Sequence, residues 1–291
     1  MGQLGVTAGE GQGPLAPEEP GAGAPDGFGI YVHVPFCRHR CDYCAFVTYT
    51  DRDHLMARYV DACVAELHQA VDAGQLPATS VFFGGGTPSR LPAEDLCRIL
   101  AAAPVAPGAE VTVECNPEDA SADRFAAYRD AGVTRISLGV QSTVPHVLAG
   151  LGRRHGSDQV PRAADLVASA GFASYNLDLI FGGAGETDDD WTRSLADVLS
   201  IPSPPPHLSA YALTVEPGTP LATERDRHPD DDVQAGRYEV ADAVLADAGY
   251  RWEEISNWAK PGHECRHNHL YWEQGNYRGI GSAAHSHQDG R

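Results

Sequence analysis

Strand-like runs that alternate with helical patterns restrict the possible folds of this chain more than any other feature. Six short apolar runs rich in β-branched residues span residues 29–34, 80–83, 110–114, 135–140, 175–181 and 208–214. The helical patterns between them include residues 53–71, where apolar side chains recur at every fourth position from Leu55 to Val71. Residues 188–199, behind a Thr187 cap, and a run from Val233 to Leu245 mark two more helices. Repeats of this kind predict an α/β fold with a parallel sheet and helical crossovers.

Polar and glycine residues gather where the predicted strands end. Cys37 follows the first predicted strand, and the sequence GGGTP (84–88) follows the second. Glu114 and Asn116 lie at the end of the third strand, Gln141 follows the fourth, and Asp178 lies within the fifth. This layout is typical of the active face of a β/α barrel, whereas an open Rossmann sheet concentrates its ligand groups at one switch point. Because six repeats are visible rather than eight, the sequence predicts a partial (β/α)6 TIM-type barrel over residues 28–250.

Composition limits the class of protein and its location. Residues 1–27 are mostly Gly, Pro, Ala and Glu without periodicity, which predicts a disordered N-terminal tail. The formal net charge of −19 argues against nonspecific binding of nucleic acid, which requires neutralisation of phosphates. The N-terminus lacks the basic and apolar regions of a signal peptide, and no apolar run is long enough to span a bilayer. We therefore expect a cytoplasmic protein, whose thiols stay reduced.

Three cysteines, Cys37, Cys41 and Cys44, occupy eight positions in the sequence CRHRCDYC directly after the first strand. Thiolates at this density in a reducing compartment favour a metal site. A structural zinc ion normally takes four protein ligands. A [4Fe–4S] cluster held by three thiolates leaves its fourth iron open to a substrate or cofactor, so we favour this interpretation. A zinc site and a redox role of the thiols remain alternatives.

Other residues at the strand ends suit a bound ligand. Glycines 84–86 let the backbone approach a ligand and offer N–H donors to a carboxylate. Glu114 and Asp178 are acceptors for ribose hydroxyls or an ammonium group. A tight turn is the simpler explanation of the glycines, and Gln141 could equally cap the end of its strand.

A second group of residues lies near the C-terminus, in the sequence HECRHNHLYW. The imidazole of His267 could be an axial ligand of heme iron, and Tyr271 and Trp272 offer aromatic faces to a porphyrin. A histidine-rich surface loop is more often solvated polar structure, however. Adventitious zinc binding by Cys265, His263 and His269 is a further alternative.

The cysteine loop resembles the cluster loop of the radical S-adenosylmethionine (SAM) superfamily. The resemblance implies that the open iron chelates the amino and carboxylate groups of SAM, and that an electron from the reduced cluster cleaves SAM to a 5'-deoxyadenosyl radical. It also implies a partial barrel of the radical SAM kind, in agreement with the layout of the strands.

Seven ordered segments narrow the resemblance: YVHVPFC, FFGGGTPS, VECNPE, SLGVQS, LGRRH, NLDLIFG and AYALTVEPGTPL. Together they are similar to the family of oxygen-independent coproporphyrinogen III oxidases and the related heme chaperones. The resemblance assigns SAM contacts, some of them to a second SAM in the oxidases, to Tyr31, Tyr43, Gly85, Gly86, Thr87, Glu114, Gln141, Arg153 and Asp178. It names no catalytic residue for this chain.

Two features separate the branches of this family. The oxidases have a further cysteine two positions after the third cluster cysteine, where this chain has Phe46. The sequence RHNHLYW matches the H-N-x-x-Y-W motif of the HemW heme chaperones. The resemblance therefore favours a heme chaperone that binds heme, a [4Fe–4S] cluster and SAM. Such a protein passes heme to an acceptor protein, which could be membrane-associated, and its cluster needs an electron donor. The alternatives are a coproporphyrinogen III oxidase and a zinc-stabilised interaction module.

The chain departs from the family pattern in two places. The sequence GGAGET (182–187) stands where relatives have something close to GLPGQT, so the loop after the fifth strand is expected to have a different shape. The chain ends at Arg291 where relatives continue into a further domain. We therefore interpret residues 251–291 as the start of an incomplete C-terminal region.

Overall fold

A computed structural model describes residues 27–291, and its central element is one nine-stranded sheet. The strand order is β7-β8-β6-β5-β4-β3-β2-β1-β9. The strands are β1 Phe28–Val34, β2 Ala78–Gly85, β3 Val105–Cys115, β4 Arg135–Gln141, β5 Ser174–Phe181, β6 His207–Ala212, β7 Arg251–Glu254, β8 Asn257–Ala259 and β9 Asn276–Ile280. Strands β1 to β6 are parallel and adjacent in chain order. This arrangement confirms the predicted partial (β/α)6 barrel.

Three strands that the sequence analysis did not predict extend both edges of this sheet. Strand β9 pairs in parallel with β1, whereas β8 pairs antiparallel with β6 and carries β7 beyond it. Residues 251–291 thus contribute to the same sheet as the six barrel strands. Whether they also begin a separate C-terminal region stays a prediction. The predicted disordered tail, residues 1–27, lies outside the described residues except for Gly27.

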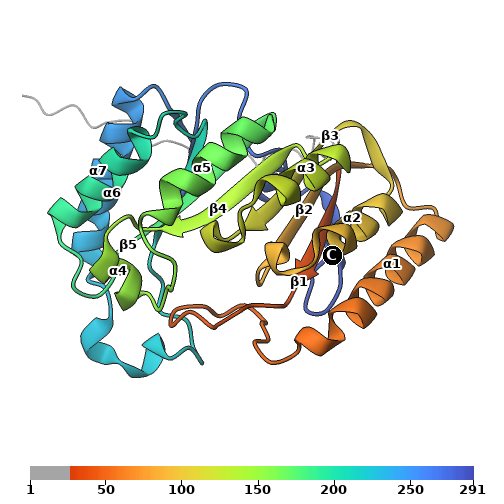
Figure 1. Ribbon diagram of the computed structural model, residues 1–291, viewed down its shortest axis with the longest axis horizontal. Coiled ribbons are helices and arrows are strands. Elements are labelled where there is room, and N and C mark those ends of the chain that lie inside the picture. Colours follow the sequence, from red (N-terminus) through yellow and green to blue (C-terminus); the bar gives the residue numbers. More distant parts are fainter. Residues whose placement is uncertain (1–26) are drawn as a thin grey trace, which may run out of the picture.

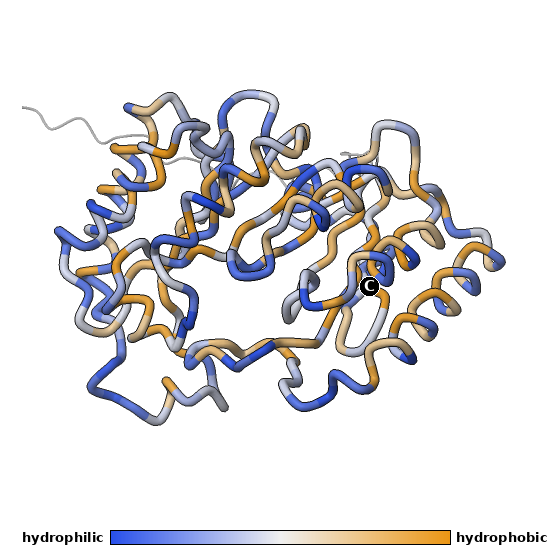
Figure 2. Tube along the Cα trace, viewed as in Figure 1, coloured by the Kyte–Doolittle hydropathy of each residue, from blue (hydrophilic) through white to orange (hydrophobic). Residues whose placement is uncertain are grey.

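Helices cover the outer face of the curved sheet, with α1 and α2 at one end and α6 and α7 at the other (Figure 1). The helices are α1 Met56–Asp72, α2 Ala93–Ala102, α3 Ala122–Asp130, α4 Pro145–Gly150, α5 Gln159–Ala170, α6 Asp188–Leu199, α7 Asp231–Asp247 and α8 Arg266–Trp272. Polar and apolar residues alternate along α1, as expected of a helix with one solvated face (Figure 2).

Alternation along each strand gives the sheet an apolar outer face and a polar inner face. Side chains such as Ile30, Val81 and Ile136 point to the helices and are fully buried. On the opposite face, register pairs Glu114 with Ser137 and Ser137 with Asn176. The inside of the barrel is therefore lined with polar and charged groups that must find hydrogen-bond partners.

Helix α8 packs against β1 and β2 near the amino ends of the barrel strands. The His267 ring on α8 stacks on Phe82 of β2, with ring centroids 5.3 Å apart, and His267 Nδ1 lies 2.8 Å from Ser80 Oγ. The N-terminus of α8 has no capping side chain of its own. Instead, the buried Glu110 of β3 accepts hydrogen bonds from the backbone N–H groups of Arg266 and His267. A carboxylate in this position satisfies free N–H groups and favours the helix dipole.

The predicted helix α6 agrees with the structure at both ends. The Thr187 hydroxyl accepts a hydrogen bond from Asp190 N, and the Asp190 carboxylate accepts one from Thr187 N, which forms a capping box. Asp230 caps α7 in a similar way by accepting bonds from Asp232 N and Val233 N.

The predicted apolar faces of two helices were partly wrong. On α1 the buried residues are Val60, Cys63, Leu67 and Ala70, whereas Leu55 and Val71 are exposed. On α7, Val233, the first residue of the predicted run, is exposed, and so is Val240 within the run. On α1 the predicted repeat of every fourth residue drifts around a helix of 3.6 residues per turn, so the first and last members of the series leave the buried face.

Two strand ends also differ from the prediction. Gly84 and Gly85 belong to β2 instead of following it, and β6 ends at Ala212, before Thr214. Within residues 27–291, none of the helices combines the length and the apolar character needed to cross a bilayer.

The corrected face of α1 can be tested by a pair of substitutions. Leu67→Ala removes a fully buried side chain and should lower the free energy of unfolding by about 2–5 kcal/mol. Val71→Ala, four residues further along, should change it by less than about 0.5 kcal/mol because Val71 is exposed. Urea unfolding of both variants measures the difference, and equal losses would contradict the assigned face.

Candidate functional site

The three cysteines lie on a loop, residues 35–52, that leaves β1 and returns toward α1 (Figure 1). Backbone hydrogen bonds from Cys37 N to Tyr49 O and from Tyr49 N to Pro35 O close its base. His33 Nε2 contacts Val47 O at 2.9 Å, which holds the second half of the loop near the barrel. All three thiols are partly exposed.

The loop covers a cavity of about 500 Å3 at the carboxyl ends of the barrel strands. Most residues predicted to form a site line this cavity: Cys37, Cys41, Cys44, Tyr43, Gly85, Gly86, Thr87, Glu114, Gln141, Arg153 and Asp178. They come from the loop, from β2 to β5, and from the segment after α4. The layout inferred from strand ends is thus present as one concave site, which is where β/α barrels bind ligands.

Two side chains from elsewhere in the barrel contact the thiols. Thr87 Oγ1 lies 3.4 Å from Cys37 Sγ, and Arg153 Nη1 lies 3.5 Å from Cys41 Sγ. The other Arg153 nitrogen, Nη2, donates to Asn116 Oδ1 at 2.7 Å and to the Gly139 carbonyl at 2.8 Å. The guanidinium is therefore fixed against β3 and β4 and presents a positive charge to the thiol group.

Three thiols on one short loop are the donor set that a [4Fe–4S] cluster requires. Burial raises the pKa of Cys37 to about 11 and also raises the pKa of Cys44, so iron binding must release protons from these thiols. Within residues 27–291, no three His, Cys, Asp or Glu side chains converge as ligands of one metal ion. In a cluster each thiolate takes its own iron, whereas the ligands of zinc all meet at one atom.

Two glycines explain why the GGGTP segment passes so close to the loop. Gly85 has φ of +102°, and a Cβ there would lie 2.4 Å from the His33 ring. A Cβ at Gly86 would lie 2.7 Å from the Val34 carbonyl oxygen. Gly86 N and Thr87 N donate to the carbonyls of Val34 and Phe36, so these two N–H groups already have partners inside the chain.

Two carboxylates, Glu114 of β3 and Asp178 of β5, face the cavity from strands on either side of β4. Burial raises the pKa of Glu114 to about 8, and the charge of Asp178 adds to this effect. Burial also raises the pKa of Asp178, although Asp178 accepts hydrogen bonds from Ser137 Oγ at 3.0 Å and from Asn176 Nδ2 at 2.6 Å. At neutral pH the Glu114 carboxyl is therefore mostly protonated, and a bound cation would favour its ionised form.

Gln141 reaches the cavity through an unusual backbone conformation. Its φ is +67°, and the pairing of β4 with β5 shifts register between Gly139 and Gln141. A non-glycine residue in the left-handed region at the end of a strand is strained, and such strain persists where the surroundings impose it. The bulge turns the Gln141 side chain into the cavity, so this residue is more than an end-of-strand cap.

Some cavity residues were missed by the sequence analysis, and one predicted residue lies outside the lining. Tyr211, Leu213 and Glu216, from the end of β6 and the segment after it, line the cavity. Their position at a strand end was the available signal. Tyr31 is not among the lining residues; its hydroxyl contacts His33 Nδ1 at 3.1 Å and its ring stacks on Phe82.

The second predicted group, on α8, is separate from the cavity and is not a surface loop. His267 is fully buried; its Nδ1 contacts Ser80 Oγ and its Nε2 contacts Tyr271 Oη, both at 2.8 Å. Burial lowers its pKa to about 3. Tyr271 and Trp272 are 37% and 55% exposed. The helix thus presents two aromatic residues to solvent, beside a histidine whose two ring nitrogens both have partners within the chain.

The alternative zinc site has a different arrangement from the one expected. Cys265 Sγ contacts Glu110 Oε1 at 3.6 Å, His263 Nδ1 contacts Ser174 Oγ at 3.1 Å, and His269 Nε2 contacts Glu253 Oε1 at 3.0 Å. Each of these three side chains thus has its own partner in the barrel.

A cysteine loop over the polar mouth of a partial barrel defines a radical SAM class of protein, and comparison with known families agrees. The model of the radical SAM superfamily matches residues 31–198, which include the cysteine loop and β1 to β5. This range is more than half of the chain.

Curated relatives give a narrower family. The heme chaperone HemW of Mycobacterium tuberculosis is 46% identical over 270 residues, which cover 89% of this chain and 69% of that protein. The heme chaperone HemW of Escherichia coli is 39% identical over 262 residues, covering 88% of this chain and 69% of that protein. The chain belongs to the radical SAM superfamily and, within it, to the family of HemW heme chaperones.

A solved structure supports the fold. Coproporphyrinogen III oxidase (HemN) from Escherichia coli, a radical SAM enzyme, superposes with a TM-score of 0.77 at 23% sequence identity. The match covers 90% of this chain and 64% of the oxidase chain. The chain thus spans less than two thirds of that structure and about two thirds of the HemW relatives.

The raised pKa of Glu114 predicts a pH dependence of stability in the chain without cofactors. The folded state favours the protonated carboxyl, so the free energy of unfolding should fall as pH rises from 4.5, the ordinary pKa, to about 8. The slope is at most about 1.4 kcal/mol per pH unit and is reduced by water in the cavity. Glu114→Gln should flatten this part of the profile, whereas Glu94→Gln, at an exposed position on α2, should not. Urea unfolding across this pH interval measures both, and parallel profiles of Glu114→Gln and wild type would contradict the assignment.

Proposed function

We propose that this chain is a HemW-like heme chaperone that binds heme, a [4Fe–4S] cluster and SAM and transfers heme to an acceptor protein. The observation that carries the proposal is the 46% identity to a heme chaperone over 89% of the chain. Three thiols around one polar cavity, and a separate helix with the H-N-x-x-Y-W motif, support it.

Cys37, Cys41 and Cys44 would hold the cluster, each through its thiolate. When reduced, such a cluster supplies an electron to a ligand at its open iron. Arg153 supports the thiolates, because its guanidinium lies 3.5 Å from Cys41 Sγ and is anchored to β3 and β4. Donation of an N–H bond to a cluster sulfur is one way in which a protein adjusts the reduction potential.

SAM would occupy the cavity beside the cluster. Glu114 and Asp178 supply negative charge and acceptors to a ligand that carries an ammonium and a sulfonium group. The close backbone at Gly85 and Gly86, together with Thr87, Gln141, Arg153 and Tyr43, completes the set that surrounds it. Tyr31 is also proposed as a SAM contact, although its hydroxyl contacts His33 Nδ1 and it does not line the cavity. Because Glu114 must ionise to meet a cation, SAM binding should release a proton and strengthen as pH rises toward 8.

Heme would bind at α8 through His267, Tyr271 and Trp272. The exposed rings of Tyr271 and Trp272 suit the face of a porphyrin. His267 is our first choice of axial ligand, although its Nε2 is hydrogen-bonded to Tyr271 Oη. Ligation of heme iron through Nε2 requires this hydrogen bond to break. His267 must therefore be released from Tyr271 before it can bind heme.

The proposed partners are an electron donor and a heme acceptor, in the cytoplasm or at its membrane surface. Arg40 and Arg154 are exposed near the cysteine loop, and Arg40 Nη2 donates to the Cys44 carbonyl at 3.2 Å. An electron donor with an acidic surface would meet these arginines close to the cluster, in a chain whose net charge is −19. The alternative activity, oxidation of coproporphyrinogen III, remains an outcome of the tests below.

Anaerobic reconstitution with iron and sulfide tests the cluster. The wild-type chain should bind about four irons, and Cys41→Ala should lose them because three thiolates are the minimum set. Cys97→Ala is the matched control, since Cys97 lies on α2 and donates to Ala127 O, away from the cavity. One zinc per chain in place of iron would favour the interaction module and overturn the proposal.

Hemin titration tests the site on α8. His267→Ala should weaken hemin binding by at least about tenfold, a loss of 1.4 kcal/mol. Tyr271→Phe keeps the aromatic ring but frees His267 Nε2, so it should bind hemin as tightly as wild type or more tightly. His146→Ala, at an exposed position on α4, is the control.

Unchanged hemin affinity in His267→Ala would count against this ligand. Anaerobic turnover of coproporphyrinogen III by the reconstituted chain would instead favour the oxidase over the chaperone.

A further inference from the structure

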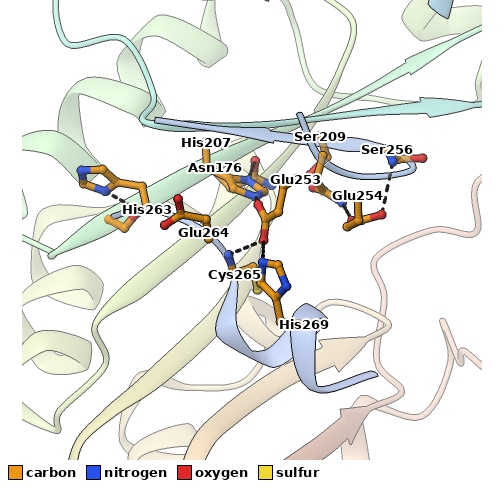
Figure 3. A network of polar contacts seen from close by, with 12 residues as sticks. Asn176, His207, Ser209, Glu253, Glu254, Ser256, His263, Glu264, Cys265 and His269 are labelled. Carbon is orange, nitrogen blue, oxygen red and sulfur yellow. Dashed lines mark hydrogen bonds and ion pairs between the residues drawn. The ribbon is translucent and has the colours of Figure 1, made fainter. Parts of the chain in front are cut away.

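A buried polar network connects the cavity to α8, and neither the sequence motifs nor the proposed function uses it. In Figure 3 the side chains of Asn176, His207 and Glu253 form a continuous row between β5 and the start of α8. His207 Nδ1 lies 2.7 Å from Asn176 Oδ1, and His207 Nε2 lies 2.8 Å from Glu253 Oε2. The His207 and Glu253 side chains are each 2% exposed.

The contacts of Asn176 fix which end of its amide faces His207. Asn176 Nδ2 lies 2.6 Å from Asp178 Oδ1, an acceptor, and also contacts Ser137 Oγ and Ser209 Oγ. Both serine hydroxyls donate elsewhere, Ser137 to Asp178 and Ser209 to Asn257 Oδ1. A flipped amide would place an oxygen against each of these acceptors. The amide oxygen must therefore face His207.

This orientation determines the protons on His207. Its Nδ1 faces the Asn176 oxygen and its Nε2 faces the Glu253 carboxylate, so each ring nitrogen must carry a proton to donate. Glu253 accepts from His207 Nε2 through Oε2 and from Cys265 N at 2.8 Å through Oε1, which also contacts His269 Nε2 at 3.0 Å. Against its own burial these donors lower the pKa of Glu253, so it stays ionised. A doubly protonated imidazole paired with a carboxylate satisfies every group in the row.

Neighbouring charged groups shift the pKa values of His207 and Glu253. Burial and Arg135 of β4 lower the pKa of His207, whereas Glu253 and Glu264 act in the opposite direction. His207 and the backbone of Cys265 help to lower the pKa of Glu253, against its own burial. Neither ring nitrogen of His207 has a donor to accept from, so the contact with the Glu253 carboxylate outweighs the effect of burial.

We propose that Glu253 is a positioning residue that keeps His207 doubly protonated and, through His207 and Asn176, ties α8 to the orientation of Asp178 in the cavity. At one end, Glu253 holds the first turn of α8 through Cys265 N and the side chain of His269. At the other end, Asn176 donates to the Asp178 carboxylate. The part that concerns Asp178 rests on the proposed binding of SAM, whereas the protonation of His207 does not.

The protonation state can be measured in the full chain without cofactors. In nitrogen-15 NMR spectra at neutral pH, both ring nitrogens of His207 should be protonated, with a His207→Gln variant used for assignment. In Glu253→Gln, the amide can donate to His207 Nε2 while its oxygen still accepts from α8. The ring should then keep only the Nδ1 proton while the fold is retained. A single protonated nitrogen in the wild-type ring would overturn the proposal, and a purely structural role of Glu253 would not change this signal.

The link to the cavity is tested by SAM titration of the reconstituted chain. Glu253→Ala leaves the donors of His207 and Cys265 without an acceptor and should weaken SAM binding by about tenfold. Glu253→Gln should restore the affinity to within about threefold of wild type, because it preserves the hydrogen-bonded row. Glu239→Ala is the matched control, since it removes the same charge at an exposed position on α7 that does not contact this network.

Each outcome has a defined meaning. Unchanged SAM affinity in Glu253→Ala would overturn the link, as would a loss in Glu253→Gln as large as that in Glu253→Ala. If Glu253→Ala does not fold, the ring spectra of wild type and Glu253→Gln still decide whether Glu253 sets the protonation of His207. If the wild-type chain does not bind SAM, the proposed function fails, and the same spectra test this inference separately.

Discussion

The polar inner face of the sheet is the constraint on which the rest of the structure depends. Parallel strands buried on both faces usually carry continuous apolar runs, but here every second position points into the barrel and many of these are polar. Each buried polar group needs a partner, and the partners come from neighbouring strands, as in the bonds of Asn176 to Asp178, Ser137 and Ser209. The same requirement places Glu110 under α8, where it satisfies the free N–H groups of that helix.

The two ends of this interior differ in chemistry. At the carboxyl ends of the strands the polar groups are left facing a cavity, so Glu114 and Asp178 are close enough to raise the pKa of Glu114. Near the amino ends, α8 and the segment before it fill the space, and Glu110 and Glu253 have donors from the backbone and from histidines. An open end with unsatisfied charge suits a ligand, whereas a closed end with matched charge suits a fixed helix.

The sequence predicted the parts of the site that depend on strand ends. Parallel strands bring their carboxyl ends to one edge, so the sequence alone groups Cys37, Gly85, Glu114, Gln141 and Asp178. The contribution of β6 through Tyr211 was missed because an aromatic residue at a strand end looks like ordinary core. The buried face of α1 was partly misjudged, since a repeat of four does not match the helical period, and on α7 two exposed valines belonged to the predicted run.

The sequence by itself determined the alternation of strands and helices, the cysteine spacing and the helix caps, because these are local patterns of hydrophobicity, spacing and side-chain type. Tertiary structure alone decided the state of His267, which is closed by Ser80 and Tyr271, and the pairing of His207 with Glu253. His267 and Ser80 are 187 positions apart, and His207 and Glu253 are 46 apart. No local pattern records which distant group will satisfy a buried nitrogen, since that choice is made only when the barrel closes around it.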